Sequence, residues 1–231
     1  YYKRRVLMME EVKTGRIVKV AGPVVVAEGM AGSRMYDVVR VGELSLIGEI
    51  VELRGDLASI QVYEETTGIG PGEPVVDTQK PLSVELGPGL IESIYDGIQR
   101  PLNLLVEVEG DFMSRGSALP GLNREKKWHF KPTVADGAKV TSGDIIGEVQ
   151  ETTLVVHKIM VPFGVDGTIQ KIAEGDYTVE ETVAICVTQD QAEIELKLMQ
   201  QWPVRSARQI TKRFAPNRVL VTGQRVIDTF F

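Results

Sequence analysis

Cysteine and histidine are scarce in this sequence, which has one Cys and two His among 231 residues. A single cysteine excludes an internal disulfide framework and is typical of a protein from a reducing compartment. Cys186 lies in the apolar run 183–187, which predicts a buried structural thiol rather than a nucleophile. His129 and His157 stand apart from each other and are not spaced as zinc ligands. We therefore predict no metal-binding residues.

Long hydrophobic runs are also lacking, and no stretch approaches the roughly 20 apolar residues that cross a bilayer. Residues 1–12 are predicted to be an N-terminal extension, because their basic start is followed by an apolar part too short for a signal peptide. Any membrane association is therefore expected to be indirect, through partner proteins.

The sequence contains no G-x-x-x-x-G-K-[ST] string, which is the usual phosphate-binding loop. The glycine-rich segment 68–73 precedes the apolar residues 75–76 rather than a helix and has no suitably placed lysine, so it is predicted to be a turn. No catalytic triad is evident either. We predict neither catalytic nor cofactor-binding residues in this chain.

Positive charge is not in excess, since the net charge of −6 argues against a nucleic-acid-binding protein. One basic stretch does occur, and because no aromatic residues are interleaved with it, we interpret it as a solvated or subunit-facing surface. Its members are Arg205, Arg208, Lys212, Arg213 and Arg218.

Glycine and short β-branched runs are abundant, which predicts a mainly β protein. Short strands at intervals of about ten residues predict a small β-barrel over residues 13–80. Within it, residues 54–56 (Arg-Gly-Asp) are predicted to form a tight hairpin turn and not an adhesion motif. A connector is expected over residues 81–111, with a short helical piece near 89–98 and a strand at 102–109.

A second β-rich block is predicted over residues 112–188, because glycine-led corners separate its short apolar strands. This pattern is typical of a flattened barrel or sandwich. Residues 189–231 are assigned to the start of a third domain. They begin with a half-exposed strand from Ile194 that ends at Trp202 and Pro203, and they continue to a helix N-capped by Thr222. The predicted apolar stripe of that helix consists of Val226, Ile227, Phe230 and Phe231.

Lys158 allows a different function, because the order of residues around it resembles biotinyl- or lipoyl-carrying domains. In those domains the modified lysine lies at a hairpin tip between methionines, whereas the neighbours here are His157 and Ile159. We interpret the likeness as shared flattened-barrel architecture, and carrier function remains an alternative together with a purely structural interaction module.

Long ordered strings in this sequence are similar to the catalytic A (alpha) subunit of archaeal- and vacuolar-type rotary ATPases. The similarity covers nearly the whole chain from about residue 15. The matching segments are 22–26, 29–32, 39–42, 46–50, 60–64, 71–75, 82–90, 94–102, 157–162, 202–205 and 222–228, together with Trp128. The block at 112–188 resembles the insertion, or bulge, that distinguishes the catalytic subunit from its noncatalytic relatives.

The resemblance implies a fold and a function. Residues 189–231 would begin an α/β nucleotide-binding domain, and the chain would be an N-terminal fragment that stops before the phosphate-binding loop. The intact subunit would synthesise or hydrolyse ATP with Mg²⁺ and couple this to proton or sodium transport. Its partners would be B subunits in a hexameric ring and the central and peripheral stalks, at the cytoplasmic face of the cell membrane. The fragment itself is expected to be inactive.

Overall fold

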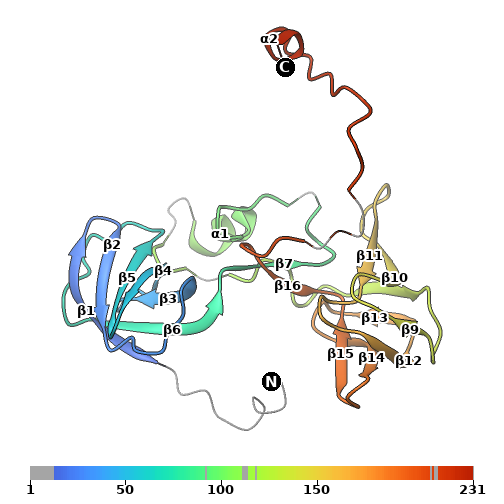
Figure 1. Cartoon of the computed structure of the whole chain (residues 1–231), viewed down its shortest axis with the longest axis horizontal. Coiled ribbons are helices and arrows are strands. Elements are labelled where there is room, and N and C mark those ends of the chain that lie inside the picture. The colour runs from blue at the N-terminus through green and yellow to red at the C-terminus, as the bar shows by residue number, and fades with distance from the viewer. Residues whose placement is uncertain are drawn as a thin grey trace.

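The computed structural model describes residues 13–91, 93–110, 114–117, 119–208, 210 and 213–230. Two β-structured units lie at opposite sides of the molecule, and a connector runs between them (Figure 1). This arrangement confirms the mainly β fold, with a small barrel followed by a second β-rich unit. No helix in the described part of the chain is long and apolar enough to span a membrane.

The first unit is a closed six-stranded antiparallel barrel with the strand order β1-β2-β5-β4-β3-β6. Alternate side chains of its strands point inward, and Val25, Val39, Ile50 and Ile60 are fully buried in its core. The strands are β1 (Thr14–Ala21), β2 (Val24–Glu28), β3 (Asp37–Val41), β4 (Leu46–Arg54), β5 (Leu57–Val62) and β6 (Pro74–Pro81).

Two turns of the barrel are as the sequence predicts. Gly55, at φ 64°, closes the hairpin between β4 and β5, and Asp56 accepts hydrogen bonds from the backbone of Gly29 (2.9 Å) and Ala31 (3.1 Å). The Arg-Gly-Asp string therefore forms the predicted hairpin turn. Segment 68–73 is also a turn, in which the Glu73 carboxylate accepts a hydrogen bond from Gly70 N at 2.6 Å.

The connector differs from the prediction in two places. Residues 102–109 form a helix, α1 (Leu102–Glu109), and not a strand. Pro101 before its first turn and Gly110 after its end, at φ 79°, are ordinary helix boundaries, and only Leu105 is buried along its length. The described part of 89–98 contains turns and an isolated bridge from Tyr95 to Pro101, so the helix predicted there is wrong.

The second unit is a sandwich of two four-stranded sheets, ordered β11-β10-β8-β13 and β15-β14-β12-β9. Phe130, Ile146, Ile169 and Cys186 are fully buried between the sheets. The burial of Cys186 agrees with the prediction, and it raises the pKa of the thiol. The strands are β8 (Trp128–Pro132), β9 (Lys139–Val140), β10 (Ile145–Gln150), β11 (Val156–Met160), β12 (Gly167–Ile172), β13 (Gly175–Tyr177), β14 (Thr182–Thr188) and β15 (Glu193–Lys197).

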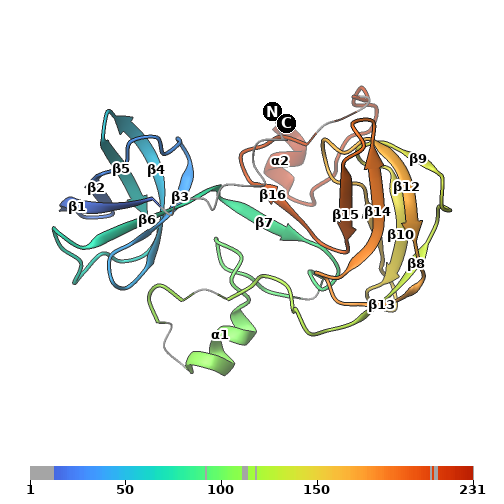
Figure 2. The ribbon, with the colours of Figure 1, turned by 90° about the horizontal axis from the view of Figure 1, so that it is seen from below.

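The sandwich continues beyond the boundary at residue 188 that the sequence suggests. β15 pairs with β14, with Ile194 opposite Cys186, and Leu196 is 1% exposed in the sandwich core. The chain then forms β16 (Gln200–Pro203), which pairs with β7 (Ser83–Leu86) of the connector. This two-stranded ribbon lies between the barrel and the sandwich (Figure 2).

The last described segment extends away from both β units (Figure 1). Its helix α2 (Arg225–Phe230) begins three residues after Thr222, so Thr222 is not the N-cap; its hydroxyl instead accepts a hydrogen bond from Gln224 N at 3.2 Å. The predicted apolar stripe at Val226, Ile227 and Phe230 is exposed to solvent. Phe231 lies outside the described residues, as does Lys212 of the basic stretch.

Candidate functional site: an arginine-centred joint between the β units

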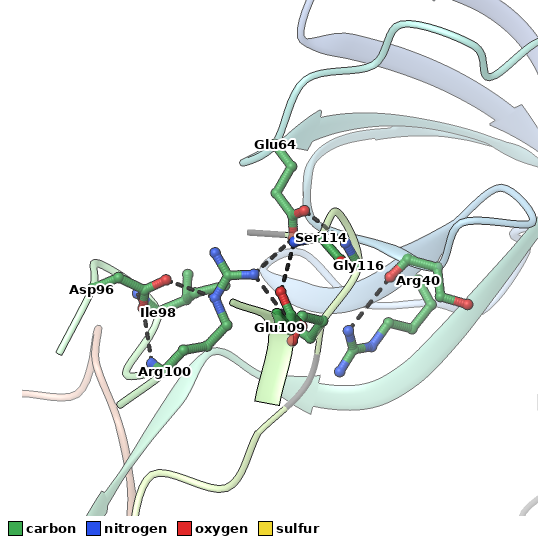
Figure 3. Close-up of polar contacts among 10 residues, drawn as sticks. Arg40, Glu64, Asp96, Ile98, Arg100, Glu109, Ser114 and Gly116 are labelled. Atoms are coloured by element: carbon green, nitrogen blue, oxygen red, sulfur yellow. Dashed lines mark hydrogen bonds and ion pairs between the residues drawn. The ribbon is translucent and has the colours of Figure 1, made fainter. Parts of the chain in front are cut away.

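Arg100 is the buried centre of the polar cluster where the connector meets the barrel (Figure 3). The residue is 9% exposed, and its Nε donates a hydrogen bond to Asp96 Oδ2 at 2.6 Å. Its Nη1 lies 3.5 Å from Glu64 Oε1 and 3.4 Å from the Ser117 carbonyl. Glu64 follows β5 of the barrel, so one guanidinium group contacts three separate segments of the chain.

A tight turn at residues 96–100 holds the Asp96 carboxylate against this guanidinium. Asp96 Oδ1 accepts hydrogen bonds from Ile98 N (3.1 Å) and Arg100 N (2.8 Å), and Asp96 N donates to Arg100 O (3.1 Å). Burial by itself raises the pKa of Asp96, but the hydrogen bonds from the Arg100 backbone and guanidinium and from Ile98 N outweigh it, so the pKa is lowered overall. The carboxylate is therefore held in its charged form.

The loop at residues 114–117 closes the other side of the cluster. Gly116 N donates to Glu64 Oε2 at 2.7 Å, and the Arg115 guanidinium donates to the carbonyl of Thr67 in the barrel. Gly116 has φ 74°, and a Cβ at this position would lie 1.8 Å from the Leu44 carbonyl oxygen. Only glycine fits this close approach between the loop and the barrel.

The same loop is tied to the end of α1. Ser114 N donates to Glu109 Oε2 at 2.6 Å. Hydrogen bonds from the Ser117 side chain and from Ser114 N lower the pKa of the Glu109 carboxyl. The helix, the loop and the barrel thus share one hydrogen-bond network around Arg100.

A second arginine connects the barrel to the segment after β16. Arg205 donates from Nε to Glu49 Oε1 at 2.9 Å and from Nη2 to Glu49 Oε2 at 2.6 Å. The Glu49 side chain is 3% exposed and also accepts a hydrogen bond from Tyr63 Oη at 2.9 Å. The Arg205 bonds lower the pKa of Glu49, whereas burial and the Glu49 carboxylate raise the pKa of Tyr63 to about 12.

Arg205 also packs on an aromatic ring of the barrel. Its guanidinium carbon lies 4.4 Å from the centre of the Tyr36 ring, and Tyr36 has φ 69°. A non-glycine residue holds this backbone conformation only where the surroundings determine it. Arg205 is therefore an ion-pair partner within the chain. Its side chain is still 53% exposed, and Arg208, Arg213 and Arg218 are exposed as well, in agreement with the predicted solvated surface.

A third arginine connects β7 to the sandwich. Arg124 forms an ion pair with Glu85 of β7 and a second one, at 2.9 Å, with Glu180 just before β14. Glu85 Oε2 also accepts from Leu122 N at 3.0 Å. Gln99 adds two hydrogen bonds to the backbone of Glu85, one as acceptor (2.6 Å) and one as donor (2.7 Å).

The three arginines have one feature in common, since each pairs with at least one carboxylate that is distant in the sequence. We call Arg100, Arg124 and Arg205, with their carboxylate partners, the joint. Arginine is suited to this role because its planar, permanently charged group matches a carboxylate with two parallel hydrogen bonds. Within the described residues no cluster of His, Cys, Asp and Glu could hold a metal ion. The arrangement ties the connector, the barrel and the sandwich together through ion pairs.

The other residues considered from the sequence lie apart from the joint. His129 is exposed between Asp176 (2.9 Å) and Glu174 (3.2 Å), which raise its pKa. His157 Nδ1 donates a hydrogen bond to the buried Glu151 carboxylate at 3.0 Å. Lys158 lies in the middle of β11, opposite Glu148.

The contacts of the joint cannot be read from the sequence, although Arg100 and Arg205 lie within the family-like segments 94–102 and 202–205. Those segments indicate a family and not which residues pair, and Arg124 lies outside them. The spacing of Asp96 and Arg100 by four residues is the one usable signal. Arg205 stands out as part of a basic stretch, but its partner lies 156 residues away.

The closed barrel, the sandwich and the arginine joint define a chain of two β-structured units connected by ion pairs. Two family models match it: the β-barrel domain of the ATP synthase alpha/beta family over residues 17–79, and the ATP synthase alpha/beta subunit barrel-sandwich domain over residues 119–205. The chain belongs to the ATP synthase alpha/beta family.

Curated relatives match almost the whole chain. The V-type ATP synthase alpha chain of Clostridium perfringens (strain SM101 / Type A) is 60% identical over 220 residues, which are 95% of this chain and 37% of that protein. The V-type alpha chain of Acetivibrio thermocellus is 60% identical over 217 residues, with 94% and 37% covered. The A subunit of the A-type ATP synthase of Pyrococcus horikoshii is 61% identical over 221 residues, with 95% and 23% covered. The chain thus spans between 23% and 37% of these relatives' length.

Proposed function

We propose that this chain is the N-terminal region of the catalytic A subunit of a V/A-type ATP synthase, and that it supplies the scaffold of the intact protein. The observation that carries the proposal is the 60% identity to V-type alpha chains over 95% of the chain, together with the barrel-sandwich domain after the barrel. The intact subunit would synthesise or hydrolyse ATP and couple this to proton or sodium transport.

The mechanical role follows from the joint. In a rotary enzyme the barrels of alternating A and B subunits would form a ring, the sandwich would project outward to the peripheral stalk, and the central stalk would turn inside the ring. Such an assembly needs rigid connections, because a flexible link absorbs torque as bending. Arg100, Arg124 and Arg205 would provide these connections between the barrel, the connector and the sandwich.

The nucleotide chemistry would belong to the rest of the intact subunit. ATP or ADP with Mg²⁺ is proposed to bind there, with positioning and charge stabilisation by the groups common to phosphoryl-transfer sites. We propose no nucleotide or metal ligand among these 231 residues. The complex would associate with the cytoplasmic face of the cell membrane through its other subunits.

A carrier function is the weaker alternative. A biotinyl or lipoyl lysine has to reach into solvent from a hairpin tip, whereas Lys158 lies within β11, and residues 151–155 form the tip between β10 and β11. Intact-mass analysis after expression with biotin or lipoate ligase would test it, and we expect an unmodified mass.

The decisive experiment is a graft. The 231 residues would replace the matching region of the Clostridium perfringens V-type alpha chain, and the ATPase activity of the assembled complex would be measured. We expect the graft to assemble and to hydrolyse ATP, and we expect the same graft with Arg100→Ala to lose coupling or assembly. A folded graft that neither assembles with B subunits nor supports activity would overturn the proposal.

A separate titration addresses the isolated chain. Mg-ATP would be added to the 231-residue protein and followed by calorimetry, with expected binding no stronger than that of an unrelated protein. Tight, saturable binding would contradict the assignment of nucleotide chemistry to the remainder of the intact protein.

A further inference from the structure

β11 is an edge strand of the sandwich (Figure 1). It pairs with β10 on one side, and within the described residues no strand pairs with it on the other. An edge strand presents backbone N–H and C=O groups that can accept a further strand.

A hollow of about 390 Å³ runs along this edge. Six consecutive residues, 155–160, line it together with residues 197–200, at the end of β15 and the start of β16. Among its apolar lining residues, Ile91 (47%) and Val156 (44%) are exposed to solvent. The hollow therefore borders the extended backbone of β11, where another extended segment could lie.

The charged groups around the hollow have mostly one sign. Lys158, Lys197 and Arg208 line it and are exposed, and in the described part of the chain neither lysine forms an ion pair. This local excess of positive charge contrasts with the net charge of −6 of the whole chain.

Glu151 is the sole carboxylate among the described residues that line the hollow, and it does not neutralise these cations. Its side chain is 1% exposed. One oxygen accepts from Gly89 N (2.7 Å) and Ile91 N (2.9 Å), and the other lies 3.0 Å from His157 Nδ1. Outside the hollow, Glu148 of β10 lies opposite Lys158, so the positive charge open to a partner is chiefly that of Lys197 and Arg208.

We propose that β11 accepts an extended acidic segment of a partner protein as an additional strand. Backbone hydrogen bonds to β11 would provide affinity, apolar side chains on one face of the segment would enter the hollow, and its carboxylates would meet Lys158, Lys197 and Arg208. The site is distinct from the joint and does not depend on the proposed function of the intact subunit.

The test uses the 231-residue protein and a labelled synthetic peptide of alternating Glu and Val. Fluorescence anisotropy would measure binding at low salt, and hydrogen exchange would report protection of the backbone amides of 156–160. We expect saturable binding, protection confined to this edge, and affinity about tenfold weaker in the double variant Lys158→Glu/Lys197→Glu. The matched control Lys171→Glu changes an exposed lysine of β12 that does not line the hollow, and it should bind as the parent protein does.

Three outcomes would overturn the proposal. The first is no binding of the alternating peptide, which would mean that Lys158 only protects an open edge. The second is equal binding of a peptide of the same charge that contains prolines and cannot form a strand, which would mean nonspecific attraction of polyanions. The third is unchanged affinity in the double variant while its thermal unfolding matches that of the parent.

Discussion

Arg205 and Glu49, which are 156 residues apart in the sequence, form a bidentate ion pair with donor–acceptor distances of 2.9 and 2.6 Å. The arginine follows the last strand of the connector ribbon, and the glutamate is buried in the barrel wall. This pair holds the segment that follows β16 against the barrel. The ring of Tyr36, whose φ is 69°, also lies against the guanidinium.

Replacing Arg205 by alanine is expected to lower the melting temperature and to speed proteolysis within residues 204–208, which are exposed but held to the barrel by this ion pair. The loss follows because the Glu49 carboxylate would stay buried with only Tyr63 as a side-chain donor. Differential scanning fluorimetry and limited digestion with thermolysin, which does not require an arginine at its cleavage site, would measure both effects. Arg208→Ala is the matched control, because Arg208 is exposed and stacks only on Trp202, at 5.0 Å.

A double-mutant cycle separates the pair from its surroundings. Glu49→Gln should cost less in the Arg205→Ala background than in the parent protein, since the partner is already lost. Additive losses would show that the pair contributes no coupling.

Arg100→Ala is expected to destabilise the chain by about 3 to 5 kcal/mol, because it leaves the carboxylates of Asp96 and Glu64 without their buried cation. Urea unfolding would measure this loss. Arg40→Ala serves as the control, since the Arg40 guanidinium makes an exposed hydrogen bond of 3.4 Å to Ser45 O; it should change stability by less than about 0.5 kcal/mol. Similar effects of the two substitutions would refute the central role of Arg100.

Gly116→Ala is expected to cost about 3 kcal/mol and to detach the loop 114–117 from the barrel. The new methyl group would overlap the Leu44 carbonyl, in addition to the strain at φ 74°. Gly55→Ala isolates the second effect: Gly55 has φ 64° but open space around it, so about 1 kcal/mol is expected. Equal losses at the two positions would mean that the close approach to Leu44 does not matter.

The buried Asp37 of β3 should give the protein an unusual dependence on pH. Burial raises the pKa of Asp37 above its ordinary value of 3.8, and the nearby Asp77 carboxylate adds to the rise. Since the folded pKa lies above the unfolded one, the stability that Asp37 contributes is present below pH 3.8 and is lost as the pH rises through the folded pKa. At pH 7 the charged carboxylate therefore opposes folding.

Asp37→Asn is accordingly expected to raise stability at pH 7 and to have little effect near pH 3. The amide oxygen can still accept the hydrogen bond from Arg34 N (3.1 Å). Urea unfolding at both pH values would measure the difference, with the exposed Asp190→Asn as the control. A loss of stability at pH 7 would contradict the prediction.

Periodicity in the sequence is a good guide where strands have one buried face. Residues of β2, β5 and β15 alternate between buried and exposed, and that pattern, together with the glycine turns, predicts the two β units. Segment 102–109 is the exception, since the order Leu-Val-Glu-Val-Glu at its end alternates like a strand. Pro101 and Gly110 are the better signals there, because they mark the ends of a helix.

The sequence by itself determined the mainly β architecture, the turns at Gly55 and 68–73 and the burial of Cys186, because each depends on neighbours within a few residues. The tertiary structure alone decided that Arg100, Arg124 and Arg205 form a joint and that β11 stays at an open edge. Charge pairing between distant residues leaves no local pattern, since a guanidinium can reach any carboxylate that the fold brings within about 3 Å. The order of the strands is likewise settled only when the sheets assemble. The alternation of buried and exposed residues along a strand does not indicate which other strand it pairs with.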